Sequence, residues 1–485
     1  MNYLDLTIKD IHEALVNKKV TPLELTKEAL KRAKEDTNNA FEYLCEKEAI
    51  EIASKLIEPE KDNLLWGIPF TVKDNISTKD IPTCASSDTL KGYVPIYNAT
   101  VVDKLLNKHA ILIGKVTLDE LAMGGTGATG HKGKTTNPYD ATKEHMVGGS
   151  SCGSAATVAS AIVPFSLGSD TGDSIRKPAS YAGLVGLKPT WSRISRFGLF
   201  PFTPSLDALG FFTRSVEDSA ILLSLLAGHD DNDFTSSNKP VDNYLEDINK
   251  PITNINIAVI QEIIDTISNQ EILAKFNECL KIYQSLGAKI NYVHLDKTLL
   301  RSLFTTYFVI SCAEATSNNA MLDGIKYGPT YEANNYAEGI YKSRTFGFSE
   351  RIKKRFIIGS YSLMKENQNE LYLRALRNRH HIVDEVNNIL KTNDVIFLPA
   401  SPTVAHRFDE QSDNLSDEYL IADNHMVIGN FAGLPSLTIP TGFIANLPFG
   451  FNLTAKAFDE KKLFNIAKAL EDKLPYYNLN ARKDK

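Results

Sequence analysis

The sequence predicts an α/β protein with a largely parallel or mixed sheet. Two short, apolar, β-prone runs, residues 66–72 and 110–116, stand on either side of a helical stretch around 101–106. Strands that alternate with helices indicate such a sheet. The chain has 485 residues, of which 43% are hydrophobic, which is enough to bury a large core.

The first sixty residues are expected to be helical. Thr21, Pro22 and Glu24 form a helix start signal, and Leu25 and Ala29 lie on the apolar face of the helix that follows. Helices at this end would pack on the strands that come next. The first half of the chain then has three loops rich in Gly and Ser, which allow a ligand to approach the backbone closely, at residues 124–130, 148–154 and 168–174.

The second half contains fewer strong signals. The polar stretch 229–254 predicts a linker or a surface excursion, and its acidic run at 230–233 lacks the glycine of a calcium loop and predicts a solvated turn. The elements expected after it are a strand at 255–259, helices to about residue 379, and buried strands at 395–398 and 437–440.

Composition argues against several classes of protein. The net charge of −6 is too acidic for a protein that wraps nucleic acid by bulk charge. No stretch approaches the ~18 apolar residues of a membrane helix. The first 15 residues mix charged and apolar residues at helical spacing, unlike a secretory signal. We therefore expect a cytoplasmic protein.

Neither the cysteines nor the histidines are spaced as metal ligands. The five cysteines are scattered and contain no CxxC pair, and the ten histidines contain no HExxH. We expect reduced thiols and no metal site.

Two serine loops bracket one helix of small residues and carry the strongest chemical signal. Ser150 precedes the helix, whose N-terminus favours developing negative charge, and Ser174 follows 24 residues later. Lys73 directly follows the apolar run 66–72. A single Gly/Ser loop before a helix is more often a helix cap, and an isolated Lys73 is more often an ion-pair partner of Asp74 or Asp170.

The two serine loops and the segment around Lys73 resemble the amidase signature family, and the resemblance covers nearly the whole chain. It implies one domain over residues 1–485, with a mixed, mostly parallel twisted sheet covered by helices on both faces. The expected segments are N-terminal helices at 1–60, a catalytic core at 61–228, a polar surface segment at 229–254, and substrate-binding residues within 255–485.

The resemblance implies that Ser174 is the nucleophile, that Ser150 is a bridging serine preceded by a cis peptide bond, and that Lys73 is the base. A lysine takes a proton near pH 7 only if its pKa falls by about three units, on the order of 4 kcal/mol. The apolar run before Lys73 suits that requirement. The family's oxyanion hole consists of backbone amides, which lie here at Thr171, Gly172, Asp173 and Ser174.

Two residues depart from the family pattern, because Asp173 and Cys152 stand where glycine is common. We expect the Asp173 side chain to turn outward, toward Arg176 or Lys177, and to leave only its N–H facing the substrate. Cys152 lies where the family has a non-reacting residue and is not expected to be the nucleophile.

The C-terminal half resembles the A subunits of glutamyl-tRNA(Gln) amidotransferases. This implies that Tyr307, Arg355 and Asp423 bind glutamine, since a free amino acid presents an ammonium to a carboxylate and a carboxylate to a guanidinium. The segments that carry the resemblance are 307–318, 343–348, 354–361 and 423–435.

The same resemblance implies partner subunits, B and C, in a heterotrimer that acts on Glu-tRNA(Gln). The B subunit would use ATP and Mg²⁺, and this chain would need no cofactor. Its nearest phosphate-loop pattern, at Gly133, Lys134 and Thr135, fails because Ala128 replaces the first glycine. The chain also lacks a basic tract that would hold tRNA alone.

Three alternatives stay open at the level of sequence. Residues 149–153 also fit the GxSxG pattern of α/β-hydrolases, with Ser151 as nucleophile and His294, His381 or His406 as base. A second alternative is a stand-alone amidase for small amides. The third is a non-catalytic scaffold subunit that has lost activity because Asp173 and Cys152 replace the glycines common in the family.

Overall fold

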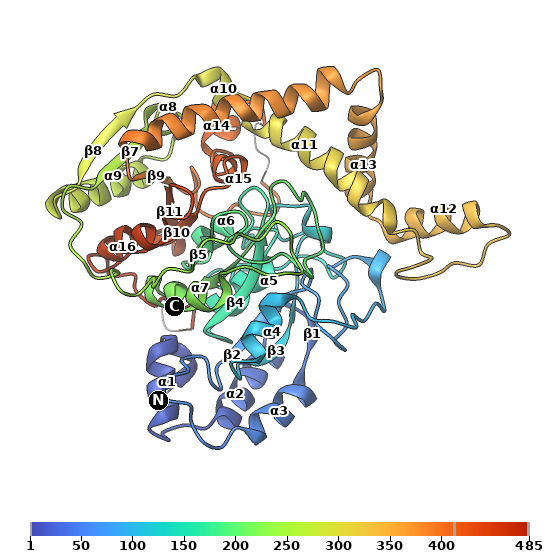
Figure 1. Cartoon of the computed structure of the whole chain (residues 1–485), viewed down its shortest axis with the longest axis horizontal. Helices are drawn as coiled ribbons and strands as arrows, with labels where there is room; N and C mark the ends of the chain where they lie inside the picture. The colour runs from blue at the N-terminus through green and yellow to red at the C-terminus, as the bar shows by residue number, and fades with distance from the viewer. Residues whose placement is uncertain (1, 411–413, 483–485) are drawn as a thin grey trace.

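One mixed sheet runs through both halves of the chain. The computed structural model describes residues 2–410 and 414–482. The sheet has eleven strands in the order β1-β3-β2-β4-β6-β5-β10-β11-β9-β7-β8 (Figure 1). The strands are β1 Phe41–Leu44, β2 Pro69–Lys73, β3 Ile111–Val116, β4 Phe165–Asp170, β5 Val185–Lys188, β6 Ala208–Thr213, β7 Asn256–Ile260, β8 Lys289–Val293, β9 Val395–Pro399, β10 Ser436–Ile444 and β11 Leu447–Ala455.

The mixed sheet is confirmed, although it contains fewer parallel pairs than the sequence suggests. Among the described strands, the parallel pairs are β2–β3, β2–β4, β7–β8 and β7–β9, and the other six pairings are antiparallel. Tight turns account for part of this difference. Ala445 and Asn446 join β10 to β11 with φ of 50° and 67°, and a two-residue turn of this kind joins antiparallel strands.

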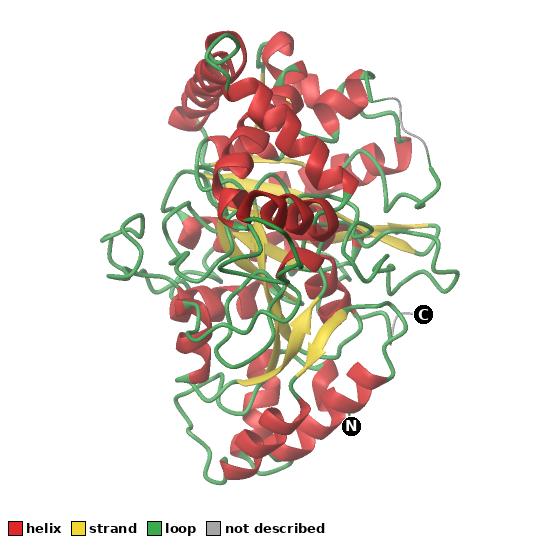
Figure 2. Ribbon diagram, turned by 90° about the vertical axis from the view of Figure 1, so that its right-hand side faces the viewer, coloured by secondary structure: helices red, strands yellow, loops and turns green. Residues whose placement is uncertain are grey.

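Helices flank the sheet (Figure 2). Single turns of 3₁₀ or π-helix lie at Tyr3–Asp5, Asp88–Leu90, Glu120–Ala122, Asn319–Met321, Asn369–Leu373 and Glu418–Ala422. The α-helices are α1 Ile8–Val16, α2 Pro22–Lys34, α3 Glu46–Lys55, α4 Thr100–Leu106, α5 Cys152–Ala159, α6 Arg176–Tyr181, α7 Val216–Leu226, α8 Gln261–Ile264, α9 Gln270–Ser285, α10 Lys297–Arg301, α11 Leu303–Asn318, α12 Tyr336–Gly347, α13 Glu350–Leu363, α14 Arg374–Thr392, α15 Val427–Phe431 and α16 Glu460–Glu471. None of the helices in the described ranges is long and apolar enough to cross a bilayer.

The N-terminal segment contains the expected helix, α2, and also a strand, β1, that the sequence did not indicate. Thr21 and Glu24 form a capping box and Pro22 is the first residue of α2. The expectation that the first sixty residues are all helical is wrong, because β1 pairs with the edge of β3. β1 is only four residues long, and it is a strand because it pairs with β3 and not because of its own residue pattern. The same holds for β8, which lies inside a stretch expected to be helical.

The polar stretch 229–254 is anchored to the body of the protein. Asp230 is 9% exposed and accepts hydrogen bonds from Ser195 and Thr100, so the expected solvated turn is only partly correct. Tyr244 is fully buried and accepts a hydrogen bond from Arg193 Nε at 2.8 Å. These contacts explain why the segment crosses the surface in a fixed path without a helix or strand of its own.

Candidate active site

Lys73 ends β2, and its side chain is buried completely. Nζ donates to three hydroxyl groups, Ser150 Oγ at 2.8 Å, Ser151 Oγ at 2.9 Å and Ser169 Oγ at 2.9 Å. The carbonyl of Ser169 lies 3.3 Å away. The parallel pairing of β2 with β4 brings Ser169 beside the lysine, and the loop before α5 supplies the other two serines.

The carboxylates that could form an ion pair with Lys73 are engaged elsewhere. Asp74 lies 3.3 Å from Lys115 Nζ, and Asp170 lies 2.9 Å from Arg176 Nη2. Within the described residues no ion pair involves Lys73, and burial lowers its pKa from the usual 10.5 to about 7. The amine is therefore largely uncharged just above neutral pH, as a general base must be.

Ser150 follows a cis peptide bond after Gly149, as expected, and stands just before α5. Asp119 fixes the loop around it. A Cβ atom on Gly149 would overlap Asp119 Oδ2, so glycine is required there. The Asp119 carboxylate also accepts hydrogen bonds from the backbone N–H groups of Thr126, Gly127, Ala128 and Thr129.

Ser174 lies between β4 and α6 and is 4% exposed. Its carbonyl accepts the N–H of Ser151 at 3.3 Å, so the two serine loops meet. Within the described residues, the backbone N–H groups of residues 171–174 have no hydrogen-bond partner. Because unpaired buried N–H groups are rare, this loop presents donors that can hold an oxyanion.

Arg176 holds this loop in shape from inside the protein. Its Nη2 and Nε donate to the Asp170 carboxylate at 2.9 and 3.1 Å, and Nη2 donates to the Gly172 carbonyl at 2.7 Å. Although burial alone raises the pKa of Asp170, Arg176 lowers it to about 2. The ion pair therefore persists across the pH range in which the enzyme would work.

Asp173 forms an ion pair with Lys177, with Oδ2 2.9 Å from Nζ. Of its two expected partners, Lys177 is correct and Arg176 is wrong, because Arg176 is bound to Asp170. Lys177 also lies 3.2 Å from Asp423 Oδ1. Burial would lower the pKa of Lys177, but Asp173 and Asp423 raise it well above its usual value.

The ion pair predicts a small effect of the Asp173→Gly substitution. Lys177 neutralises the carboxylate, so we expect amide-hydrolysis kcat to change by less than about tenfold. Steady-state hydrolysis at saturating substrate measures this. An increase of about a hundredfold or more would show that the carboxylate opposes the oxyanion.

Tyr307 on α11 packs against the same loop, and Arg355 on α13 lies near Tyr307. The Tyr307 ring lies 3.2 Å from the position of a Cβ on Gly172, and burial raises the pKa of its hydroxyl. Arg355 stands over the ring of Phe308, with 5.2 Å from its Cζ to the ring centroid, and its Nη1 is buried without a hydrogen-bond partner. This unpaired guanidinium nitrogen is available to a carboxylate ligand.

The structure favours neither Cys152 nor Ser151 as the nucleophile. Cys152 is buried, and burial raises the pKa of its thiol to about 12, so the thiolate is scarce. Ser151 Oγ donates to the Ser169 carbonyl at 3.0 Å. His294 pairs with Glu262, His406 pairs with Glu410, and neither these nor His381 hydrogen-bonds Ser151 in the described part of the chain.

Sequence reasoning missed the roles of Ser151 and Ser169 as partners of Lys73. Both lie in the Gly/Ser loops noted above, so composition marked the loops and left open which hydroxyl faces the amine. Asn75 was missed as well, and it donates from Nδ2 to Ser169 Oγ at 3.0 Å. The pairing of β2 with β4 brings Ser169 to Lys73 and Asn75, and the loop before α5 brings Ser151.

Comparisons with known proteins show which proteins this chain is similar to. The amidase family model matches residues 24–464. The chain is 39% identical to the A subunit of glutamyl-tRNA(Gln) amidotransferase from Staphylococcus saprophyticus, over 97% of this chain and 98% of the relative. It is 38% identical to the protein of the same name from Pediococcus pentosaceus, over 97% of each chain.

Solved structures give the same result. The crystal structure of the A subunit of glutamyl-tRNA(Gln) amidotransferase from Thermotoga maritima matches with a TM-score of 0.80 and 34% identity, over 98% of this chain and 96% of that one. The peptide amidase of Stenotrophomonas maltophilia shares the fold, with a TM-score of 0.81 at 24% identity over 97% of each chain. The chain belongs to the amidase signature family.

Proposed function

We propose that this chain is the glutaminase subunit of a glutamyl-tRNA(Gln) amidotransferase. It hydrolyses the side-chain amide of glutamine and supplies ammonia that converts Glu-tRNA(Gln) to Gln-tRNA(Gln). The observation that carries the proposal is the 39% identity with an amidotransferase A subunit over 97% of the chain. The buried lysine, the two serine loops and the unpaired amides support the hydrolytic step.

Catalysis begins with the transfer of a proton away from Ser174. Uncharged Lys73 accepts the proton of Ser150 while Ser150 accepts that of Ser174, and Ser174 Oγ attacks the amide carbon of glutamine. The ammonium formed on Lys73 is stabilised by the hydroxyls of Ser151 and Ser169. The negative charge on the former carbonyl oxygen is held by the free N–H groups of residues 171–174, each worth about 3 kcal/mol in the transition state.

Collapse of this intermediate releases ammonia. The proton returns from Lys73 through Ser150 to the departing nitrogen, the C–N bond breaks, and an ester remains on Ser174. Water then attacks the ester with the same relay as its base, and glutamate leaves with Ser174 restored. Protons and charges balance over the cycle, which consumes one glutamine and one water and yields glutamate and ammonia.

Glutamine recognition is assigned to Tyr307, Arg355 and Asp423. The free Nη1 of Arg355 would bind the α-carboxylate and Asp423 would bind the α-ammonium, while Tyr307 packs against Gly172 of the oxyanion loop. Asp423 is held in place by Lys177 Nζ, which donates to its carbonyl at 2.7 Å.

Asp423→Asn is expected to raise the glutamine KM at least about tenfold and to leave phosphonylation of Ser174 unchanged. The substitution removes the charge that pairs with the substrate ammonium and leaves the base and the nucleophile intact. Glutaminase kinetics and the rate of reaction with a fluorophosphonate measure the two effects. Unchanged glutamine kinetics would exclude Asp423 from the binding site.

The proposal includes partner subunits, B and C, in a heterotrimer located in the cytoplasm. Ammonia is a product that a bare glutaminase would lose to solvent, so its use requires a second active site. The B subunit would activate glutamate on the tRNA with ATP and Mg²⁺, and this chain would bind neither.

Reconstitution tests the function directly. The chain combined with B and C subunits, glutamine, ATP, Mg²⁺ and Glu-tRNA(Gln) should form Gln-tRNA(Gln). Hydrolysis of small amides without partners, and no tRNA product with them, would favour a stand-alone amidase. Failure of a fluorophosphonate to label Ser174 in the complex would favour a scaffold without catalysis.

A further inference from the structure

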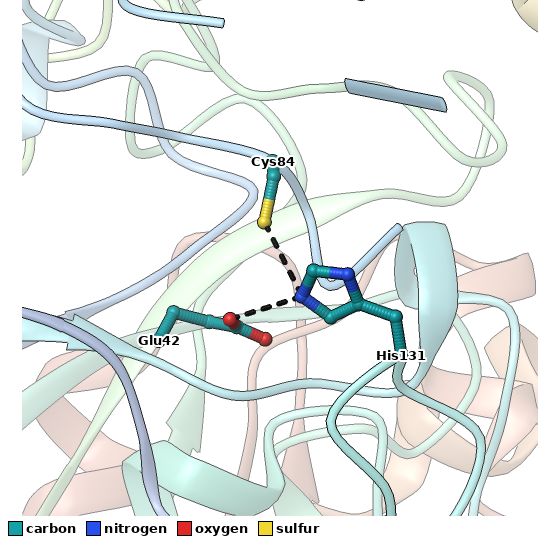
Figure 3. A group of neighbouring side chains, drawn as sticks. All are labelled: Glu42, Cys84 and His131. Atoms are coloured by element: carbon teal, nitrogen blue, oxygen red, sulfur yellow. Dashed lines mark hydrogen bonds and ion pairs between the residues drawn. The ribbon is translucent and has the colours of Figure 1, made fainter. Parts of the chain in front are cut away.

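A group of potential metal ligands lies outside the serine–lysine site. Glu42, Cys84 and His131 offer a carboxylate oxygen, a sulfur and a ring nitrogen that all lie within 4.8 Å of one another. Figure 3 shows the three side chains converging, with the same imidazole nitrogen facing both the carboxylate and the sulfur. Sequence spacing gave no sign of this group, because the residues come from β1, the loop after β2 and the loop after β3.

We propose that Glu42, Cys84 and His131 form a zinc site, with water as the fourth ligand. Thiolate, imidazole and carboxylate together are typical of Zn²⁺, whereas Ca²⁺ and Mg²⁺ prefer sets of oxygen ligands. Three protein ligands and one open position give a tetrahedral site that is accessible from solvent.

The distances fit one tetrahedral ion. His131 Nε2 lies 3.7 Å from Cys84 Sγ and 3.1 Å from Glu42 Oε2. Zinc with bonds of about 2.3 Å to sulfur and 2.0 Å to nitrogen and oxygen separates S from N by about 3.5 Å and N from O by about 3.3 Å. The third pair, the Glu42 carboxylate oxygen and Cys84 Sγ, lies within 4.8 Å and must close to about 3.5 Å, so side-chain movements of up to about 1 Å let the three atoms bind zinc.

The surroundings of the ligands fit a metal site as well. His131 Nδ1 lies 3.0 Å from Asp88 Oδ1, which is the carboxylate–histidine pairing that orients a metal-binding imidazole. Ser86 Oγ donates to Glu42 Oε1 at 2.5 Å, and the other carboxylate oxygen, Oε2, faces His131. The side chains of Glu42 and His131 are 4% and 18% exposed, so the ligands are shielded and still reachable.

Charged side chains lie around and within the group of three ligands. Three carboxylates surround the group, because Cys84 Sγ donates to Asp74 Oδ2 at 3.2 Å in addition to the contacts of Glu42 and Asp88. Two lysines oppose them. Lys115 lies 3.3 Å from Asp74 and is buried, whereas Lys132 lies 3.2 Å from Glu42 Oε2 and is 41% exposed. Lys132 competes with the metal for the Glu42 carboxylate, and its hydrogen bonds to the carbonyls of Phe41 and Glu42 can hold it in place after the ion displaces it from that carboxylate.

Zinc here would fasten the loops that carry the catalytic groups. Asp74, the neighbour of Lys73, accepts the N–H of Cys84 at 2.8 Å. His131 follows the loop that Asp119 holds beneath Gly149. An ion joining the two loops to β1 would stabilise the folded chain in proportion to the logarithm of its concentration over Kd. The role is structural, and no catalytic step depends on it.

Cobalt substitution of the reduced full-length chain tests the site. One equivalent of Co²⁺ should give a sulfur-to-cobalt charge-transfer band and the visible bands of tetrahedral cobalt, and Zn²⁺ should displace both. Cys84→Ser should abolish the charge-transfer band. Zn²⁺ titrated by calorimetry should bind with one-to-one stoichiometry, and Asp88→Asn should weaken binding about tenfold.

His294→Ala is the matched control, because His294 also pairs with a glutamate, Glu262, at 2.8 Å but has no cysteine in that pair. This variant should bind Zn²⁺ and Co²⁺ as the wild type does. The wild-type chain alone can overturn the proposal, through absence of the charge-transfer band or of stoichiometric zinc binding. The same band in Cys84→Ser would also overturn it. His131 would then act only as an ion-pair bridge between Glu42 and Asp88.

Discussion

Replacement of Ser174 with alanine is expected to lower glutaminase kcat by at least about 10⁴-fold. In the proposed mechanism Ser174 Oγ forms the acyl-enzyme, and neither Ser151 nor Cys152 is suited to replace it. Ser151 donates to a carbonyl and the Cys152 thiol has its pKa raised to about 12 by burial. Steady-state glutamine hydrolysis and fluorophosphonate labelling should both report the loss.

Cys152→Ala is the control for this prediction. The thiol is as buried as Ser174 and lies two residues after Ser150, yet the account gives it no chemical role. We expect its kcat to stay within about tenfold of the wild type. Activity of Ser174→Ala above about 1% of wild type, with contamination excluded, would assign the nucleophile to another residue.

Replacement of Lys73 with alanine is expected to lower kcat by about 10³- to 10⁴-fold. A positioned base contributes about 10²- to 10⁴-fold, and the substitution also removes the amine that lies 2.8 Å from Ser150 Oγ. Glutamine KM should change much less than kcat, because the amine does not contact the proposed glutamine-binding residues. Steady-state kinetics over a range of glutamine concentrations separate the two parameters.

Lys188 provides a matched control for Lys73. It is also buried, and burial lowers its pKa to about 7 as well. Within the described part of the chain its Nζ donates to the carbonyls of Pro189 and Leu434 and to no serine. Lys188→Met should therefore keep kcat within about tenfold of the wild type. An equal loss in both variants would mean that any buried lysine is needed for folding, and that Lys73 is not a specific base.

The site was predictable where its residues are close in sequence. The loops around Ser150 and Ser174 are continuous segments, and Lys73 ends a strand whose apolar run could be recognised. The hydrogen-bond partners of Lys73 were harder to predict from the sequence, because Ser169 lies beside Lys73 only through the pairing of β2 with β4. Arg176 could not be distinguished from Lys177 as the partner of Asp173 without the position of Asp170.

The fold was predictable to the same degree. Strands with continuous apolar runs, such as β2, β3 and β9, stand where the sequence indicated them. The short edge strand β1 and the half-exposed β8 were missed, because their own residues carry weak patterns and their neighbours in the sheet define them. The Glu42, Cys84 and His131 group was missed for a related reason, since three separate segments contribute its members.

The rate at which a fluorophosphonate labels Ser174, measured against pH, tests the central role of Lys73 most directly. The reaction needs the nucleophile and its base but neither glutamine nor partner subunits. Lys73 is a base only as the free amine, so the wild-type rate should fall about tenfold per pH unit below pH 7 and level off above it. Lys73→Ala should lose this inflection and Lys188→Met should keep it. A wild-type labelling rate that varies by less than about twofold between pH 5 and 9 would contradict the account.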